Sequence, residues 1–245
     1  MGIHGPLSTL PLLDAGLPAG VRGGFTTRAG GRSRTPYAGL NLGDHVGDDP
    51  ALVAAHREAL RRALAADALV VPRQVHGADV VEVVSPPATA PQADALFTRV
   101  PGIAVAVVVA DCVPVLLTDP RAGLVGVAHA GRPGLVAGVV PALVAAMRAA
   151  GARDLHAALG PSVCGGCYEV PAGMAEDVVA LVPAARARTR RGTPAVDVAA
   201  GVRAQLAGLG VPSRDVARCT AEDADLYSYR RDGTTGRSAG AVVLA

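Results

Sequence analysis

Three side chains with metal-binding or nucleophilic chemistry lie beside short runs of aliphatic residues. They are His76 in the string QVHG, Cys112 in ADCVP and His129 in HAG. In the last two strings a predicted strand ends at the reactive residue, and Pro or Gly then turns the chain. This places the side chain at the rim of a sheet, where ligands commonly bind.

Two neutral imidazoles and one thiolate form a ligand set for zinc. The set leaves the fourth tetrahedral position to water or substrate, as a catalytic zinc requires. The separations between His76, Cys112 and His129 are long and match no local motif. On composition and spacing alone, a buried structural cysteine with two surface histidines is the simpler interpretation.

Cys164-Gly-Gly-Cys167 has the two-residue spacing of redox and zinc-binding cysteine pairs. Only one such pair exists, and the two glycines between the thiols are typical of a tight turn. The sequence therefore favours a turn over a metal or redox site here.

Alternating strands and helices must position these side chains. Aliphatic runs predict strands over 103–110, 113–118, 123–128, 155–159 and 239–244. Periodicity and capping residues predict helices over 50–66, 134–149 and 197–208, and Pro141 should kink the second or end its first half. The hairpin-like pair in the middle indicates a mixed sheet. Without repeats or linkers, residues 1–245 are expected to form one domain.

Composition excludes several classes of protein. All 23 cations of the chain are arginine, so a pyridoxal-phosphate lysine, a P-loop lysine and a Ser-Lys pair are impossible. A net charge of +2 gives no reason to expect nucleic acid or an acidic membrane as partner. The N-terminus lacks the features of a secretory signal, and the apolar stretch 103–118 is too short and interrupted for a membrane span. We therefore expect a cytoplasmic monomer whose cysteines are free thiols or metal ligands.

Motifs throughout the chain resemble the laccase-domain family, also called the YfiH-like or polyphenol-oxidase family and now described as a purine nucleoside phosphorylase family. The matching strings, which span about residues 21–244, are GGFTTRAGG (23–31), YAGLNLGDHVGDD (37–49), QVHGADVV (74–81), ADALFT (93–98), VADCVPVLLTDP (109–120), VGVAHAGRPG (125–134), ALGPSVCGGCYEV (158–170) and CTAEDADLYSYRRDGTTGR (219–237). The resemblance implies an α+β fold, a four-layer αββα sandwich with mixed sheets. It also implies that His76, Cys112 and His129 bind zinc, or copper in the same site.

One motif departs from the family pattern. The family usually reads HAG-Trp-Arg-Gly, whereas this chain reads HAG followed by Arg132, Pro133 and Gly134. Arg132 therefore stands one position before the usual arginine.

The resemblance implies phosphorolysis of adenosine, inosine, guanosine and methylthioadenosine, together with adenosine deamination. Because the chain lacks lysine, phosphate must bind to arginines, helix N-termini or backbone N–H groups. Arg28 and Arg230 are the candidates, and Tyr168 and Tyr229 are candidates for lining the base pocket. The expected partners are thus a purine nucleoside and phosphate.

Three alternatives remain open from the sequence. Cys112 could be the nucleophile of a metal-free hydrolase or amidase acting on cell-wall peptides, with His129 or His76 as base. Copper in the three-ligand site could support phenol oxidation, although six histidines without a His-x-His pair cannot build a multicopper laccase. Finally, zinc could merely stabilise a non-enzymatic protein that binds a partner.

Overall fold

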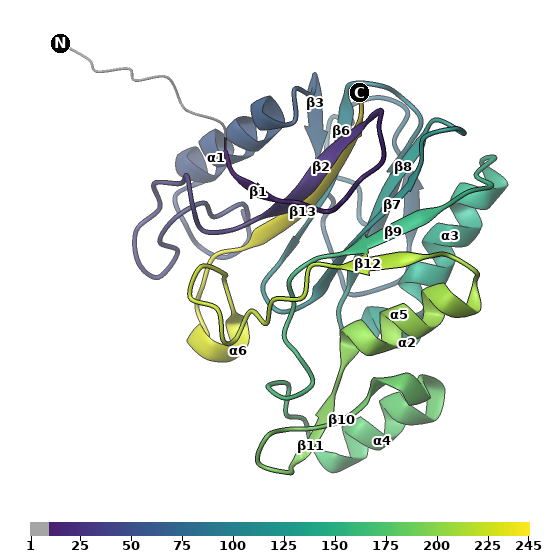
Figure 1. Cartoon of the computed structure of the whole chain (residues 1–245). Coiled ribbons are helices and arrows are strands. Elements are labelled where there is room, and N and C mark those ends of the chain that lie inside the picture. The colour runs from purple at the N-terminus through teal and green to yellow at the C-terminus, as the bar shows by residue number, and fades with distance from the viewer. Residues whose placement is uncertain (1–9) are drawn as a thin grey trace.

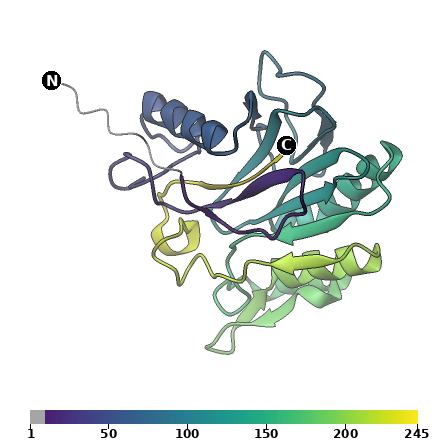
Figure 2. The same cartoon turned by 45° about the horizontal axis from the view of Figure 1, so that its top comes forward.

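Two β-sheets lie face to face in the middle of the molecule (Figures 1 and 2). The computed structural model describes residues 10–245. The five-stranded sheet has the order β1 (Leu12–Leu13), β2 (Val21–Thr26), β13 (Ser238–Leu244), β6 (Ile103–Val109) and β3 (Ala68–Val70). The six-stranded sheet has the order β12 (Ser213–Asp215), β9 (His156–Leu159), β7 (Val113–Asp119), β8 (Leu124–Ala130), β5 (Ala95–Thr98) and β4 (Val80–Glu82).

Both sheets are mixed, as the sequence predicted. The pairs β3–β6, β4–β5 and β9–β12 are parallel, and the remaining neighbours run antiparallel. The central strands β6, β7, β8 and β13 are buried along their whole length. This burial explains why β6 reads as an unbroken aliphatic run and why β7, β8 and β13 consist largely of aliphatic residues.

Helices cover the two outer faces of the sheet pair. The helix α1 (Pro50–Ala63) lies against the five-stranded sheet, and α2 (Arg132–Ala137), α3 (Val139–Ala149) and α5 (Val198–Gly208) lie against the six-stranded sheet (Figure 1). Three separate apolar layers fill the spaces between helix and sheet, sheet and sheet, and sheet and helix. The predicted α+β class and αββα sandwich are therefore confirmed.

The remaining elements between α3 and α5 extend from the six-stranded side. They are α4 (Ala172–Leu181), the 3₁₀ turn Pro183–Ala185, and the two-stranded sheet of β10 (Arg186–Arg188) and β11 (Pro194–Val196). The short helix α6 (Tyr229–Asp232) lies apart from them (Figure 1), and its Asp232 pairs with Arg28, two residues after β2. Across residues 10–245, no helix combines the length and the apolar character that a membrane crossing needs.

Capping residues set the helix starts as predicted. The Asp49 carboxylate accepts from the Ala51 N–H at the start of α1, and the Asp197 carboxylate accepts from the Ala200 N–H at the start of α5. These bonds satisfy N–H groups that the first helical turn leaves without a partner.

The predicted helix over 134–149 is divided into two helices, but the predicted position of the break is wrong. The chain breaks between α2 and α3 at Gly138, whose φ is 81°, three residues before the Pro141 that was expected to kink the helix or end its first half. Proline cannot donate to the carbonyl four residues earlier and its ring collides with that turn. Glycine takes up the left-handed conformation there without a Cβ clash, so the break falls at Gly138.

Candidate metal centre

The crossover between the two sheets brings Cys112 and His129 together. Cys112 lies in the short link from β6, in one sheet, to β7, in the other. The first residue of β7, Val113, pairs with Ala130 at the end of β8, one residue after His129. The start of β7 and the end of β8 therefore lie next to each other at the same end of the sheet, and the Cys112 thiol and the His129 imidazole meet there.

His76 reaches the same place from the loop between β3 and β4. Its Nε2 lies 3.9 Å from the Cys112 Sγ. The rings of His76 and His129 have centroids 4.7 Å apart and an interplanar angle of 72°. The donor atoms of the three residues all lie within 4.8 Å of one another. The structure thus brings together the three predicted metal ligands.

The donor set and its spacing fit a tetrahedral metal ion. Zn–S bonds of about 2.3 Å and Zn–N bonds of about 2.0–2.1 Å place neighbouring S and N ligand atoms about 3.6 Å apart. The observed 3.9 Å between Cys112 and His76 needs only a small closure to reach this value. Three ligands leave one position free, as a catalytic site requires.

A buried aspartate, Asp94, holds two of the ligands in place. Its carboxylate accepts backbone hydrogen bonds from Val75 (3.1 Å), His76 (2.9 Å) and Gly77 (2.7 Å). It also contacts the Nδ1 of His129 at 2.8 Å. This bond turns the Nε2 of His129 toward the other ligands.

The same contacts set the charge of the site. Burial alone would raise the pKa of the Cys112 thiol, but the positive charge of His129 and hydrogen bonds from His129 and His76 outweigh it and lower the pKa. Burial opposes protonation of His129, yet Cys112 and Asp94 raise its pKa. Cys112 is therefore inclined to ionise, which is the state that binds metals and attacks electrophiles.

Backbone conformation at the site is strained in two places. His76 has φ 61° and Asp111 has φ 91°, both in the left-handed region that favours glycine. The Asp111 carboxylate accepts from the Thr220 hydroxyl and from the Arg230 N–H, each at 2.6 Å. Such strain, of about 1–3 kcal/mol per residue, is typical of functional sites.

The close packing around position 131 explains why the HAG string ends in glycine, Gly131. A Cβ at this position would lie 2.9 Å from the Cδ2 of His76 and 3.0 Å from the Sγ of Cys112. Real Cβ atoms do not approach carbon and sulfur so closely, so a larger residue would displace both ligands.

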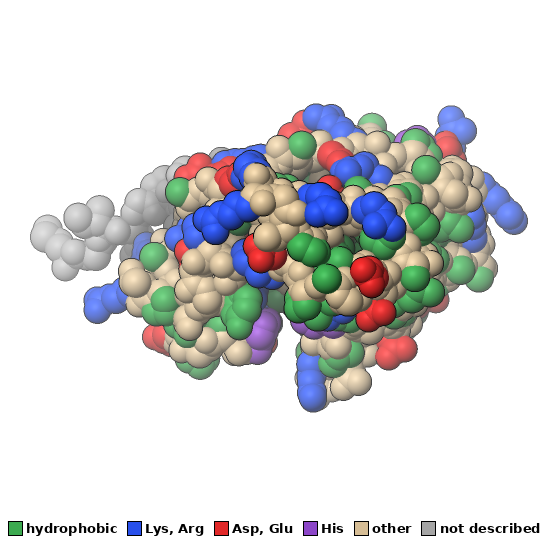
Figure 3. Space-filling model, turned by 90° about the horizontal axis from the view of Figure 1, so that it is seen from below, with side chains coloured by type: hydrophobic (Ala, Val, Ile, Leu, Met, Phe, Trp, Pro, Cys, Tyr) green, Lys and Arg blue, Asp and Glu red, His purple; other side chains and the backbone are tan. Residues whose placement is uncertain are grey.

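A cavity of about 590 Å³ opens beside the three ligands. Histidine side chains border the hollow on the face shown in Figure 3. The volume lies within the range of small-molecule sites. The cavity lining includes all three ligands and the polar residues His45, Gln74, Asp111, Arg132, Tyr168, Tyr229, Arg230 and Arg237.

Three of the four predicted substrate residues line this cavity. The guanidinium of Arg230 lies over the ring of Tyr168, 5.0 Å from its centroid. Tyr229 is 63% exposed and also lines the cavity. The structure thus places Tyr168, Tyr229 and Arg230 beside the candidate metal ligands.

The fourth, Arg28, lies elsewhere. Its guanidinium pairs with Asp232 at 2.8 Å and stacks over Tyr227, and it is not among the residues lining the cavity. These two contacts already engage its charge. Phosphate binding by Arg28 stays a prediction, and the cavity offers other arginines for that role.

Arg132 and Arg237 are cavity residues that sequence reasoning did not assign to phosphate. Arg132 follows the HAG string and opens α2, so the departure from the family pattern still leaves an arginine at the cavity. Arg237 is half-buried, and burial lowers its pKa. It lies in the string CTAEDADLYSYRRDGTTGR, which was the available signal.

Asp94 and Gln74 were also missed. The Gln74 amide donates to the Val108 carbonyl and accepts from the Val108 N–H, both at 2.8 Å, which fastens the QVHG loop to β6. Both residues lie in strings that resemble family motifs, ADALFT and QVHGADVV, but an orienting role depends on contacts that only the fold creates.

The fold and the site define a sandwich protein with a His/Cys/His centre at the junction of its sheets. A family model described as multi-copper polyphenol oxidoreductase laccase matches residues 22–245. The chain belongs to this laccase-domain family, as its motifs indicated.

Relatives and solved structures agree with this assignment. A purine nucleoside phosphorylase of Streptomyces coelicolor is 55% identical over 232 residues, which cover 92% of this chain and 96% of that one. A purine nucleoside phosphorylase of Deinococcus radiodurans is 48% identical over 238 residues, which cover 93% and 90%. A crystal structure of a Neisseria meningitidis protein matches with a TM-score of 0.87 at 33% identity, covering 97% of this chain and 99% of that one. The structure of YlmD from Geobacillus stearothermophilus matches with a TM-score of 0.84 at 36% identity, covering 92% of each chain.

Proposed function

We propose that the protein is a zinc-dependent purine nucleoside phosphorylase that also deaminates adenosine. One observation carries the proposal: His76, Cys112 and His129 share a single cavity with arginines and tyrosines. The relatives named purine nucleoside phosphorylase support the substrate class. Adenosine, inosine, guanosine and methylthioadenosine are the proposed nucleosides.

The arginines of the cavity would bind the phosphate. With no lysine in the chain, Arg230 and Arg237 are the proposed anion donors, and Arg132 stands at the same cavity. Guanidinium groups match phosphate oxygens through paired N–H donors. Two or three of them would hold the dianion next to the ribose and offset its charge.

The tyrosines would bind the base. Arg230 stacks over one face of the Tyr168 ring, and Tyr229 is an exposed residue that lines the cavity. A planar purine can stack on such rings, which gives affinity without requiring one particular base. This arrangement supports a broad preference among purines.

The candidate ligands lie at the end of the cavity formed by the sheet junction. Zinc bound there would supply Lewis-acid chemistry and activate water for deamination. The chain's own contribution is to hold the ligand atoms through Asp94 and to keep the Nε2 of His129 directed at the site. The Asp111 carboxylate accepts from the Thr220 hydroxyl and the Arg230 backbone N–H, and so holds Arg230 in place at the cavity.

Product chromatography tests the proposal. Protein of measured zinc content is incubated with inosine or adenosine, with and without phosphate. We expect free base and ribose 1-phosphate only with phosphate, and inosine from adenosine in either condition. If zinc-loaded protein consumes neither nucleoside, the proposal fails.

A metal-free cysteine hydrolase is the second candidate. It is favoured by the lowered pKa of Cys112 beside His129, itself bonded to Asp94, since a thiolate near an oriented imidazole is a nucleophile. Chelation separates the two functions. A cysteine hydrolase retains turnover of cell-wall peptides without metal, whereas a zinc phosphorylase loses its turnover.

Copper-dependent phenol oxidation would use the same three ligands. Within residues 10–245, His76 and His129 are the histidines that converge on a candidate metal group, which is too few for a multicopper centre. Phenol oxidation by copper-loaded but not zinc-loaded protein would identify this activity.

A further inference from the structure

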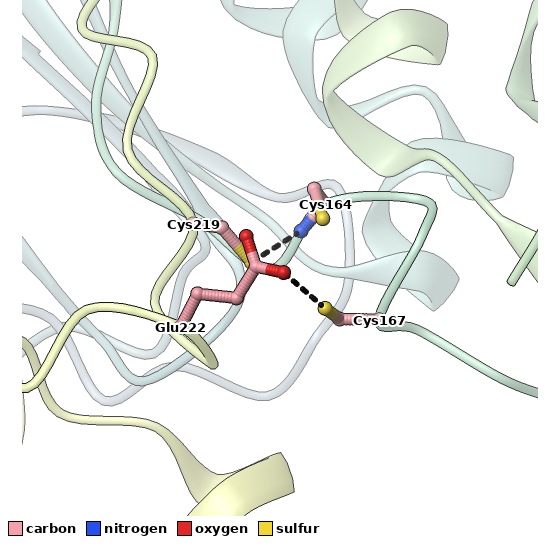
Figure 4. Close-up of side chains that lie close together, drawn as sticks. All are labelled: Cys164, Cys167, Cys219 and Glu222. Carbon is pink, nitrogen blue, oxygen red and sulfur yellow. Dashed lines mark hydrogen bonds between the residues drawn. The ribbon is translucent and has the colours of Figure 1, made fainter. Parts of the chain in front are cut away.

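A second group of potential metal ligands lies outside the cavity. Cys164, Cys167, Cys219 and Glu222 converge from two segments far apart in the sequence (Figure 4). One ligand atom from each residue lies within 4.8 Å of the others. All three cysteines are free thiols, and each is partly shielded from solvent.

Backbone hydrogen bonds hold the three cysteines of this group near one another. The predicted turn at Cys164 is confirmed, because the N–H groups of Cys167 and Tyr168 both donate to the Cys164 carbonyl, at 2.9 and 3.0 Å. The turn is bridged to the second segment where Ser162 pairs with Cys219. The sulfur of Cys219 accepts from the Cys164 N–H at 3.3 Å, which joins the turn to the second segment.

We propose that Cys164, Cys167, Cys219 and Glu222 bind a structural zinc ion. Three thiolates and one carboxylate give the four protein ligands of a closed tetrahedral site. Sulfur ligands of such a site lie about 3.8 Å apart, so a contraction of about an ångström closes the observed group around the ion.

The surrounding charges suit a cation with this ligand set. Three thiolates and a carboxylate leave a zinc complex with net negative charge, and Arg190 lies at its edge. The Arg190 guanidinium pairs with Glu222 and lies 3.3 Å from the Cys167 sulfur. Its side chain is 65% exposed, so it can adjust while still neutralising the complex.

Cysteine binds zinc as the thiolate, so zinc binding would release the protons of the three thiols.

The position of the group gives the proposed zinc its role. Val163 and Tyr168, which flank the cysteine turn, line the cavity, and so do Tyr229 and Arg230 from the segment that follows Cys219. Zinc would cross-link these two segments and fix the cavity wall. The site is independent of the proposed function, because its test reads metal content and coordination rather than turnover.

The decisive experiment removes the first metal centre and asks whether zinc remains. In the full-length His76→Ala/Cys112→Ala variant, purified under reducing conditions, elemental analysis should find about one zinc per chain. X-ray absorption should show about three sulfur neighbours at about 2.3 Å. Bound zinc should also protect the three remaining cysteines from alkylation.

Further variants assign the ligands. Wild type should hold about one zinc more than Cys164→Ser/Cys167→Ser. Glu222→Gln should lower zinc affinity about tenfold or more, whereas the exposed Glu176→Gln should leave it unchanged. If the serine variant does not fold, the His76→Ala/Cys112→Ala measurement still decides. Absence of zinc there, sulfur-poor coordination, or a disulfide among the three cysteines would overturn the proposal.

Discussion

The carboxylate of Asp94 contacts the Nδ1 of His129 at 2.8 Å, and both side chains are buried, with 0% and 3% of their surface exposed. The same carboxylate binds the backbone N–H of His76 at 2.9 Å. One buried group therefore orients two of the three candidate metal ligands. Loss of this carboxylate should therefore lower metal affinity more than it lowers the stability of the fold.

Asp94→Asn should lower zinc affinity at the His/Cys/His centre about 10- to 100-fold, because outer partners of metal-binding histidines typically have this effect. Competition with a chromophoric chelator measures the affinity. Turnover lost at limiting zinc should return in part when zinc is added in excess.

The matched control is a second buried aspartate at the opposite end of β7. Asp119 likewise accepts three backbone N–H groups, from Ala122, Arg153 and Asp154, but contacts no metal ligand. Asp119→Asn should leave zinc affinity unchanged. Equal losses of affinity in Asp94→Asn and Asp119→Asn would contradict the orienting role of Asp94.

The lowered pKa of Asp119 also makes the stability of the fold depend on pH. Burial opposes its ionisation, but the backbone N–H bonds outweigh burial and lower its pKa below the ordinary value. Its contribution is therefore present above the unfolded-state pKa of about 3.9 and is lost as pH falls through the lower folded-state pKa.

Asp119→Asn should destabilise the protein by about 1–3 kcal/mol at neutral pH and flatten the loss of stability in acid. Urea unfolding of both proteins from pH 7 down to about pH 3 provides the comparison. Parallel pH curves for wild type and variant would argue against a depressed pKa at Asp119.

Gly131→Ala should disrupt the metal centre without unfolding the sandwich. The added Cβ would meet His76 and Cys112 at 2.9 and 3.0 Å, so these ligands must move apart. We expect a loss of bound zinc with little change in the far-ultraviolet circular dichroism spectrum. Gly173→Ala, where a Cβ meets nothing within 4 Å, is the control. Full zinc retention in Gly131→Ala would show that the site is looser than described.

Arg237→Ala and Arg230→Ala should each raise the KM for phosphate about 10- to 100-fold, which corresponds to the loss of one charged hydrogen-bond partner. The KM for inosine should change less. Arg121→Ala, an exposed turn arginine outside the cavity, should leave both constants near wild type. A larger effect on inosine than on phosphate would reassign these arginines to the nucleoside.

Much of the sandwich was predictable because burial leaves a direct mark on sequence. The unbroken aliphatic run of β6 and the aspartates at the starts of α1 and α5 are local signals. The three candidate ligands were recognised through family strings rather than spacing. Their convergence depends on the crossover from β6 to β7, which no local pattern encodes.

Features created by long-range contacts could not be predicted in this way. In the sequence, Asp94 is an ordinary aspartate within the string ADALFT. Its contact with His129 arises only because β5 pairs with β8 in the fold. Cys219 and Glu222 come beside the cysteine turn through contacts between distant segments, such as the bridge between Ser162 and Cys219 and the bond from the Cys164 N–H to the Cys219 sulfur. Arg28 resembled a phosphate ligand beside glycines, but its neighbours in space are Asp232 and Tyr227.

The most direct test of the central claim is the rate of ribose 1-phosphate formation from inosine and phosphate by zinc-loaded His76→Ala. The account predicts a loss of at least about 100-fold, since metal chemistry contributes several kcal/mol. The matched control His156→Ala, whose exposed side chain lies outside the cavity, should stay near the wild-type rate. Wild-type turnover in His76→Ala would contradict the claim that phosphorolysis depends on the His76, Cys112 and His129 centre.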